Sequence, residues 1–329
     1  MGQLIEGVWD TDPKFPTGGD GSFQRKPSTF RNWVTADGSA GPTGKAGFKA
    51  ESGRYHLYMS YACPWAHRTL IYRALKGLEQ HITVDVVHPD MLANGWTFST
   101  EFDGATGDRE NGAEYLYQIY QKADPRANTR STVPVLWDRE TGTIVSNESA
   151  EIIRMFNSAF NGLSGNRDDY YPEPLRAEID ALNERIYKTI NNGVYRSGFA
   201  TSQGAYERAV SEVFDSLDWL EDRLSARRYL AGDQVTEADW RLLPTLLRFD
   251  PVYHGHFKCS RNRLVDFPSL WGYARELYQW PGVAGTVNFD HIRRHYHYSH
   301  AGVNPHRIVP LAPAIDWAES HGRDWLAAA

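Results

Sequence analysis

The fold of this chain is decided by the stretch Tyr58-Met59-Ser60-Tyr61-Ala62-Cys63-Pro64-Trp65-Ala66-His67-Arg68. It continues a β-prone segment, residues 55–59, and leads into a helical pattern over residues 65–78. Pro64 suits the first position of a helix, because the N–H that proline lacks would be unpaired there. The stretch therefore predicts a strand, a turn that carries Cys63, and a helix.

The sequence contains only two cysteines, Cys63 and Cys259, which is too few for a disulfide framework and indicates thiols in a reducing compartment. Cys63 is expected to be a nucleophile, because helix N-termini lower the pKa of a cysteine thiol from about 8.5. The turn holds no second thiol of the kind a dithiol redox motif has, so an external thiol must resolve any disulfide. The alternative, a buried structural cysteine, is disfavoured by the strand-turn-helix context.

The overall composition fits a globular protein without a nucleic-acid partner. The chain has 329 residues, 41% hydrophobic and 23% charged, with a formal net charge of −6. Lys and Arg do not cluster into the basic face that phosphate groups require. No segment reaches the roughly 20 apolar residues of a membrane-spanning helix, and residues 1–10 do not resemble a secretory signal. We therefore expect a soluble, cytoplasmic protein.

The chain divides into an arm, an α/β domain and a helical domain. Residues 1–50 are rich in Gly, Pro and Ser and predict an extended, mostly irregular arm. Residues 51–165 predict the α/β domain, and residues 166–329 predict a helical domain that ends in an aromatic tail. The period of the apolar residues switches to helical at this second boundary.

Further elements are predicted within both domains. In the α/β domain they are a strand at 82–87, a helix at 114–121, a hairpin of strands at 133–137 and 143–145, and a helix at 149–157 capped by Asn147. In the helical domain they are helices at 175–191, 206–224, 237–249 and 270–278. Thr236 and Asp239 form a capping-box signal before the third of these helices. Beyond Pro281 the chain is expected to be irregular.

Two motifs favour binding of a peptide-like ligand. Val133-Pro134 opens a strand, where a proline suggests a cis bond and a bend that offers the Val133 backbone. Asn147-Glu148-Ser149 begins a helix and supplies N–H groups, a hydroxyl and a carboxylate, which suit an amino-acid zwitterion. Taken singly, each motif is more often an ordinary edge strand or helix cap. Their order after the Cys63 turn favours a binding site.

Together these motifs resemble the glutathionyl-hydroquinone reductases, the Xi class of glutathione transferases. The similar segments are the Cys63 turn, Asn94-Gly95-Trp96, Arg130-Ser131-Thr132-Val133-Pro134-Val135-Leu136-Trp137-Asp138 and Ser146-Asn147-Glu148-Ser149. The likeness covers nearly the whole chain, and its Cys-Pro-Trp-Ala motif differs from Tyr-type and Ser-type transferases. It implies an N-terminal thioredoxin-like domain at 51–165 that binds glutathione, an all-α C-terminal domain, and a homodimer.

The resemblance also implies roles for individual residues. It assigns glutathione binding to Trp96, Arg130, Val133, Glu148 and Ser149. It assigns the aromatic side of the substrate to Tyr195, Tyr253 and Tyr296, and it makes Tyr195 and Tyr296 catalytic together with Cys63. These roles agree with the chemistry of the side chains, since an arginine can pair with a carboxylate and a phenol can donate a proton.

The activity that the resemblance implies is reductive removal of glutathione from glutathionyl-hydroquinones. Cys63 would form a mixed disulfide with glutathione, and the products would be hydroquinone and oxidised glutathione. An Omega-like thiol transferase or dehydroascorbate-type reductase would use the same cysteine. A non-catalytic binding module would keep the fold without turnover.

Histidines of the tail, residues 291–306, raise the question of a zinc site. His295 and His297 do not fit the usual zinc-ligand spacings. We therefore expect no metal cofactor, with glutathione as the co-substrate.

Overall fold

The computed structural model describes residues 2–12 and 17–326 of the chain. The chain forms two units. The first consists of Met1–Lys14, Pro27–Asp168 and Gly285–His295; the second consists of Phe15–Lys26, Asp169–Ala284 and Tyr296–Ala329. Residues 17–26 of the predicted arm thus belong to the second unit, and the segment Gly285–His295 of the predicted tail belongs to the first.

The first unit is built around a mixed sheet of order β4-β3-β7-β8. The strands are β3 (Tyr55–Met59), β4 (Ile82–Val86), β7 (Val135–Asp138) and β8 (Thr143–Ser146). β3 pairs in parallel with β4 and antiparallel with β7, and β7 pairs antiparallel with β8. Each strand and the hairpin were predicted from the sequence.

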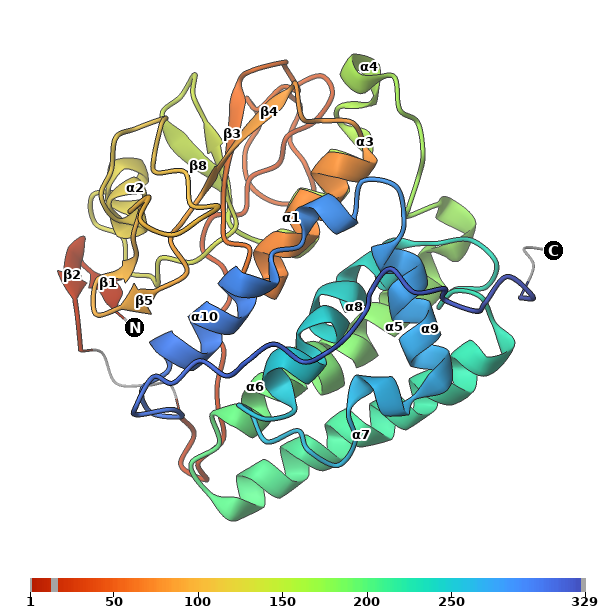
Figure 1. Ribbon diagram of the computed structural model, residues 1–329. Helices are drawn as coiled ribbons and strands as arrows, with labels where there is room; N and C mark the ends of the chain where they lie inside the picture. The colour runs from red at the N-terminus through yellow and green to blue at the C-terminus, as the bar shows by residue number, and fades with distance from the viewer. Residues whose placement is uncertain (1, 13–16, 327–329) are drawn as a thin grey trace. The chain divides into compact units, whose positions relative to one another are not determined.

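Helices cover both faces of this sheet. Figure 1 shows α1 (Pro64–Leu75) and α3 (Ser149–Ser158) on one side and α2 (Leu116–Ala123) on the other. Since successive side chains of a strand alternate, Tyr55, Leu57 and Met59 share one face of β3. All five residues of β3 are buried. The sheet therefore has a core on each face, as in an α/β domain.

The remaining elements of the first unit are short. They are β1 (Gln3–Ile5), β2 (Val8–Asp10), β5 (Met91–Leu92), β6 (Gly95–Trp96) and α4 (Asn161–Ser164). β1 pairs with β2, so the arm contains a hairpin where the sequence predicted mostly irregular structure.

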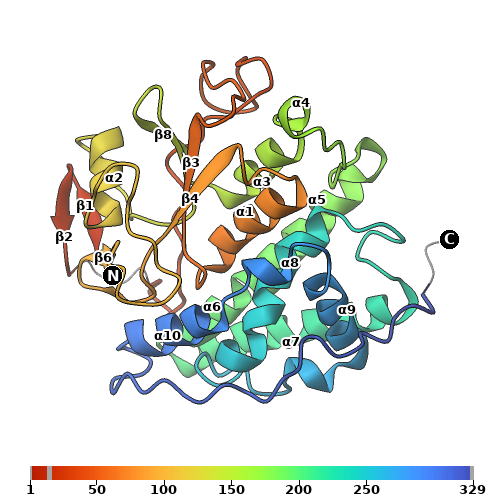
Figure 2. The same ribbon diagram turned by 45° about the horizontal axis from the view of Figure 1, so that its top comes forward.

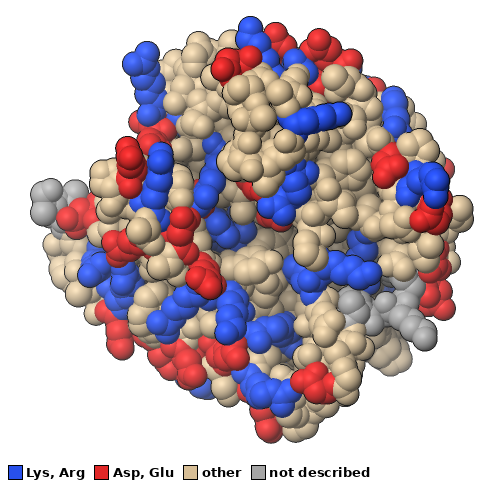
Figure 3. Space-filling model, turned by 180° about the vertical axis from the view of Figure 1, so that it is seen from behind, with Lys and Arg blue, Asp and Glu red and all other residues tan. Residues whose placement is uncertain are grey.

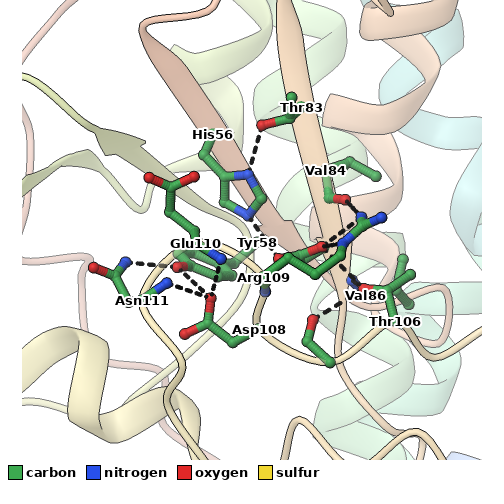
Figure 4. A network of polar contacts seen from close by, with 12 residues as sticks. His56, Tyr58, Thr83, Val84, Val86, Thr106, Asp108, Arg109, Glu110 and Asn111 are labelled. Carbon is green, nitrogen blue, oxygen red and sulfur yellow. Dashed lines mark hydrogen bonds and ion pairs between the residues drawn. The ribbon is translucent and has the colours of Figure 1, made fainter.

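A buried polar network joins the loop that follows β6 to the sheet. Asp85 of β4 is fully buried, and its carboxylate accepts bonds from Arg109 Nε at 2.6 Å, the Arg109 N–H at 2.7 Å and Thr106 Oγ1 at 3.1 Å. His56 Nε2 lies 3.3 Å from the same carboxylate. Figure 4 shows His56, Thr106 and Arg109 converging from β3 and the loop. The network holds the loop on the sheet.

Replacing Asp85 with Asn is expected to lower the free energy of unfolding by about 1 to 3 kcal/mol at neutral pH, because Arg109, Thr106 and His56 lose a charged acceptor that is itself fully buried. Burial opposes ionisation of Asp85, but the bonds from His56 and Arg109 outweigh it and hold the pKa below the ordinary 3.8. A lowered pKa stabilises the fold above that ordinary value, and the stabilisation is lost as the pH falls through the folded pKa. Urea unfolding at about pH 7 and at successively lower pH below about 4 should therefore show the gap between the two proteins closing.

The matched control for this prediction is Asp215→Asn, at an exposed position of the second unit. It should change the free energy of unfolding by no more than about 0.5 kcal/mol. If the difference in the free energy of unfolding between wild type and Asp85→Asn stayed constant as the pH fell, the stabilisation could not come from the ionised carboxylate of Asp85.

The second unit is helical. Its elements are η1 (Glu173–Leu175), α5 (Arg176–Ile186), η2 (Tyr187–Asn191), α6 (Gly193–Gly198), α7 (Gln203–Ala226), α8 (Glu237–Arg248), η3 (Phe249–Tyr253), η4 (Leu264–Asp266) and α9 (Pro268–Tyr278). Figure 2 shows α7, of 24 residues, running along α6 and α9. The four helices predicted for this region are present. Residues 187–191, predicted as the end of the first, continue α5 as a π-helical turn.

The start of α8 follows the predicted capping box. The Thr236 N–H and hydroxyl donate to Asp239 Oδ2 at 2.7 and 3.0 Å, and the Asp239 N–H donates to the Thr236 carbonyl at 3.1 Å. Both residues are fully buried. The box therefore satisfies backbone groups that a helix start leaves unpaired inside the core.

Two predictions of local structure are wrong. The chain directly after Pro281 is not irregular, because η5 (Ala284–Thr286) and α10 (Phe289–Ser299) follow it, and the predicted irregular structure is found only over residues 300–326. A cap signal precedes α10, since the Asn288 side chain accepts the His291 N–H at 3.0 Å. The second error concerns α3. Its N-cap is Glu148, whose side chain accepts the Ala150 N–H, whereas Asn147 bonds elsewhere.

Charged side chains of both signs are spread over the face shown in Figure 3. This mixture accompanies the modest formal net charge of −6. Within the residues that the structure describes, no helix combines the length and the apolar character needed to cross a bilayer.

Candidate active site

Cys63 lies at the turn between β3 and α1 and is partly exposed. It is the N-cap residue of α1, with φ −78° and ψ 119°, and Pro64 takes a first-turn position as predicted. The Cys63 carbonyl accepts the His67 N–H at 3.0 Å. The sulfur is thus attached at the end of the helix where the dipole and the unpaired N–H groups favour an anion.

The segment beside this thiol contains a cis peptide bond. The Val133-Pro134 bond is cis, which confirms the prediction from the strand-opening proline. Val133 is buried, and the Cys63 thiol donates to its carbonyl oxygen at 3.6 Å, a long contact of the kind sulfur makes. Tyr120 Oη fixes the preceding residue by donating to the Thr132 carbonyl at 2.8 Å and accepting its N–H at 3.2 Å. The structure therefore brings Cys63 and Val133 together.

Glu148 and Ser149 open α3. Glu148 Oε1 accepts the Ala150 N–H at 3.1 Å, and the Glu148 N–H donates to Ser146 Oγ at 3.1 Å. Glu148 is partly exposed and Ser149 is buried. A carboxylate has about four acceptor positions, so Glu148 retains capacity for a further donor. The helix start thus presents an acceptor for a cationic group.

Trp96 and Arg130 come from segments before β7. Trp96 is on β6, is buried, and stacks on the ring of His295 with centroids 4.6 Å apart and an interplanar angle of 20°. His295 Nδ1 lies 2.8 Å from the Pro89 carbonyl oxygen, which fixes the imidazole. Arg130 lies between α2 and β7 and is partly exposed. The orientation of the Trp96 indole is therefore set by a residue of α10.

Three tyrosines meet in the second unit. They are Tyr195 of α6, Tyr253 at the end of η3, and Tyr296 of α10. Tyr296 Oη lies 2.5 Å from Tyr195 Oη and 3.1 Å from Tyr253 Oη. Tyr253 and Tyr296 are fully buried, while Tyr195 is partly exposed. The structure thus gathers the three predicted tyrosines into one cluster with Tyr296 at its centre.

Two of these phenols hold their protons. Burial first, and then the neighbouring Tyr195, raise the pKa of Tyr253 and that of Tyr296 well above the usual value of 10. Arg248 opposes this effect only in part. Both hydroxyls are therefore protonated at neutral pH, and the cluster can donate a proton.

Three histidines of the tail contact backbone carbonyls, and a fourth, His300, contacts His256, with 3.2 Å between His256 Nε2 and His300 Nδ1. Ring nitrogens of His291, His295 and His297 lie 2.7, 2.8 and 3.3 Å from backbone carbonyl oxygens. Across residues 2–12 and 17–326, no group of three or more His, Cys, Asp or Glu side chains is placed to hold a metal ion.

Comparisons with known proteins match both units. The model described as the N-terminal domain of glutathione S-transferase matches residues 62–159, and that of the C-terminal domain matches residues 203–276. Glutathionyl-hydroquinone reductase YqjG of Escherichia coli strain K12 is 59% identical and covers 98% of this chain and 99% of its own. Glutathionyl-hydroquinone reductase PcpF of Sphingobium chlorophenolicum is 51% identical over 95% of this chain and 97% of its own.

Solved structures agree with these relatives. The glutathione-bound structure of YqjG has a TM-score of 0.92 and 57% identity, and covers 98% of this chain and 99% of that one. The Xi-class transferase from Natrialba magadii has a TM-score of 0.92 and 49% identity, and covers 99% of this chain and 98% of that one. The chain belongs to the Xi class of glutathione transferases. The predicted family and fold class are therefore confirmed.

Sequence reasoning missed several residues that support the site of this Xi-class transferase. His295 stacks on Trp96, and Tyr120 ties the Thr132 backbone to Asn147, whose side-chain amide donates to Tyr120 Oη at 3.0 Å. The Asn288 cap was a signal for the helix that carries His295. No local pattern marked Tyr120, because its role depends on contacts with Thr132 and Asn147, which lie later in the chain.

Proposed function

We propose that this Xi-class transferase reduces glutathionyl-hydroquinones, with glutathione as the co-substrate. The observation that carries the proposal is the Cys63 thiol at the start of α1, with its sulfur 3.6 Å from the Val133 carbonyl oxygen. A thiol there is suited to attack sulfur, and the adjacent backbone is suited to hold the cysteinyl part of glutathione.

The first unit supplies the proposed glutathione contacts. Val133 would form backbone hydrogen bonds to the cysteinyl unit, and Arg130 would pair with the glycyl carboxylate. Glu148 and Ser149 would hold the γ-glutamyl end, where the carboxylate accepts bonds from the ammonium group. Trp96 would form a flat wall, since its ring is held by the stack on His295.

The proposed reaction has two sulfur-exchange steps. The Cys63 thiolate attacks the glutathione sulfur, the bond from that sulfur to the aromatic carbon breaks, and the ring carbon takes the electron pair and a proton. Hydroquinone leaves, and Cys63 is joined to glutathione in a mixed disulfide. A second glutathione thiolate then attacks this disulfide, which releases oxidised glutathione and returns the Cys63 thiolate.

The tyrosine cluster supplies the proposed proton. Tyr195 and Tyr296 would act as donors to the ring carbon, because their hydroxyls lie 2.5 Å apart and can share a proton. Tyr253 would line the substrate side and donate to Tyr296, whose hydroxyl lies 3.1 Å away. Burial keeps Tyr253 and Tyr296 protonated at neutral pH, so the proton to be donated is present.

The experiment that tests the activity is product analysis. Glutathionyl-menadiol or glutathionyl-benzohydroquinone would be incubated with glutathione and the full chain, and the aromatic product and oxidised glutathione would be quantified. We expect one hydroquinone and one oxidised glutathione per turnover. Turnover of glutathione-cysteine mixed disulfide or dehydroascorbate without any reduction of either conjugate would favour an Omega-like thiol transferase instead. No turnover of any substrate would favour a binding module.

Replacing Arg130 with Ala is expected to weaken glutathione binding by about 10- to 100-fold, because a bond to a charged group contributes about 1.5 to 3 kcal/mol. Calorimetric titration would measure the loss. The rate at which iodoacetamide alkylates Cys63 should change little and serves as the control for the thiol site. Unchanged affinity would remove Arg130 from the glutathione contacts.

The proposed setting is the cytoplasm, where reduced glutathione is available to resolve the mixed disulfide. We also propose that the chain forms a homodimer, as implied by the resemblance to the class. Light scattering coupled to size-exclusion chromatography would test this, with a mass near twice 37.4 kDa expected. A mass of one chain at micromolar concentration would contradict it.

A further inference from the structure

Part of the N-terminal arm lies against the beginning of α3. The Asn32 N–H donates to the Val145 carbonyl at 2.9 Å, and Arg31 forms an antiparallel bridge with Ser146. These contacts place residues 28–32 along the edge strand β8, as an added strand would lie. The arm therefore reaches the loop that carries Glu148 through backbone bonds.

Phe30 of the same segment is held by both of its backbone polar groups and by its ring. The Phe30 N–H donates to Asn147 Oδ1 at 3.1 Å, and the Asn147 N–H donates to the Phe30 carbonyl at 3.2 Å. The Phe30 ring packs edge-on against Tyr120, with centroids 5.7 Å apart. Tyr120 also bonds to Asn147, so Phe30, Tyr120 and Asn147 contact one another and join the arm to the start of α3.

Ser28 contacts the carboxylate of Glu148 directly. Its hydroxyl donates to Glu148 Oε2 at 3.0 Å, with the Asn147 carbonyl a longer alternative acceptor at 3.3 Å. Glu148 Oε1 already accepts the Ala150 N–H at 3.1 Å. Each oxygen of the carboxylate thus has a donor of its own, and the two donors come from different segments of the chain. Such a pair of bonds fixes the plane of the carboxylate.

We propose that Ser28 is a positioning residue for glutathione, which orients Glu148 toward the α-ammonium group of the γ-glutamyl end. This rests on the proposed function, in which Glu148 accepts that group. A carboxylate held in one orientation loses less rotational freedom when the ligand binds, so part of the ordering cost is removed in advance. The arm then contributes to glutathione binding by orienting Glu148.

The test is calorimetric titration of the full chain with two probes. S-methylglutathione cannot form a mixed disulfide with Cys63, and its analogue with a glutaryl group in place of the γ-glutamyl group lacks only the α-ammonium group. Ser28→Ala is expected to weaken binding of S-methylglutathione by about 3- to 10-fold and binding of the glutaryl analogue by less than about 2-fold. Ser28→Thr keeps the hydroxyl and should bind S-methylglutathione with nearly the wild-type affinity.

The control for general loosening of the arm is Thr35→Ala. The Thr35 hydroxyl donates to Asp37 Oδ1 at 3.3 Å and to the Ser39 carbonyl at 2.8 Å, and Thr35 lies outside the proposed glutathione contacts. Its removal should leave both affinities unchanged. The melting temperature of every variant would be measured alongside, so that loss of folded protein is not mistaken for loss of affinity.

Glu148→Gln separates the two levels of the proposal. If it removes the preference for S-methylglutathione and Ser28→Ala has no further effect in that background, both assignments stand. The role of Ser28 is overturned if Glu148→Gln weakens binding of S-methylglutathione and Ser28→Ala does not. It is also overturned if Ser28→Ala weakens binding of both probes equally. If Glu148→Gln leaves the preference for the ammonium group intact, the proposed contact of Glu148 itself fails.

Discussion

Replacement of Cys63 by Ala or Ser is expected to reduce turnover of glutathionyl-hydroquinones by more than about 1,000-fold. The proposed first step needs a thiolate to attack sulfur, and neither a methyl group nor a serine hydroxyl, which is not ionised at neutral pH, can replace it. Steady-state rates of hydroquinone release with saturating glutathione would measure the loss. The fold should be intact, because Cys63 is partly exposed and both replacements are small.

The second cysteine provides the internal control for this prediction. Cys259 is fully buried, and burial raises the pKa of its thiol to about 12. It should therefore react slowly with iodoacetamide near neutral pH, whereas Cys63 should react rapidly. Mass spectrometry should show one fast alkylation in the wild type and none in Cys63→Ser. Turnover of that variant at more than about 1% of the wild-type rate would rule out the mechanism.

The elements that were predicted correctly are specified by residues close to one another in the chain. Pro64 marks the start of α1, and Thr236 with Asp239 marks the start of α8, because each signal satisfies or removes backbone donors within one helical turn. The strand-opening Pro134 indicated its cis bond in the same way. Local rules were sufficient wherever the stabilising partners are neighbours in sequence.

The elements that were missed depend on partners far apart in the chain. α10 carries His, Tyr and Arg rather than a clear apolar stripe, and contacts such as the stack of His295 on Trp96 bury it. The cap of α3 was assigned to Asn147, which instead bonds to Phe30 and Tyr120. Asn is a good N-cap. Here, however, its amide oxygen accepts the Phe30 N–H of the arm, and its amide nitrogen donates to Tyr120 of α2. Tertiary contacts overrode a sound local preference.

The candidate site shows the same division. Cys63 and Val133 could be proposed from the turn and the proline, since both signals are local. Glu148 and Ser149 followed from the helix start that they occupy. The tyrosines could be proposed only from the resemblance to the family, because Tyr195, Tyr253 and Tyr296 come from three elements of an 18-tyrosine chain. Their shared hydroxyl contacts became visible only in the folded unit.

Replacing Tyr296 with Phe is expected to lower kcat for glutathionyl-hydroquinones by about 10- to 100-fold, with little loss of glutathione affinity. As sulfur is pulled from the aromatic carbon, electron density accumulates there, and a protonated phenol can donate to it. Burial keeps the pKa of Tyr296 well above 10, so its proton is present at neutral pH. The substitution keeps the ring and removes only the hydroxyl that bonds to Tyr195 and Tyr253.

A second substrate decides whether Tyr296 acts at the ring carbon. A non-aromatic mixed disulfide of glutathione releases a thiolate and needs no proton on carbon, so Tyr296→Phe should leave its turnover nearly unchanged. Tyr273→Phe is the matched control, because it removes another buried hydroxyl of the second unit, one that donates to Asp239 at 2.7 Å. It should affect the melting temperature more than the ratio of the two rates. Equal losses on both substrates in Tyr296→Phe would instead mean that Tyr296 acts through packing, since a proton donor to carbon can affect only the aromatic leaving group.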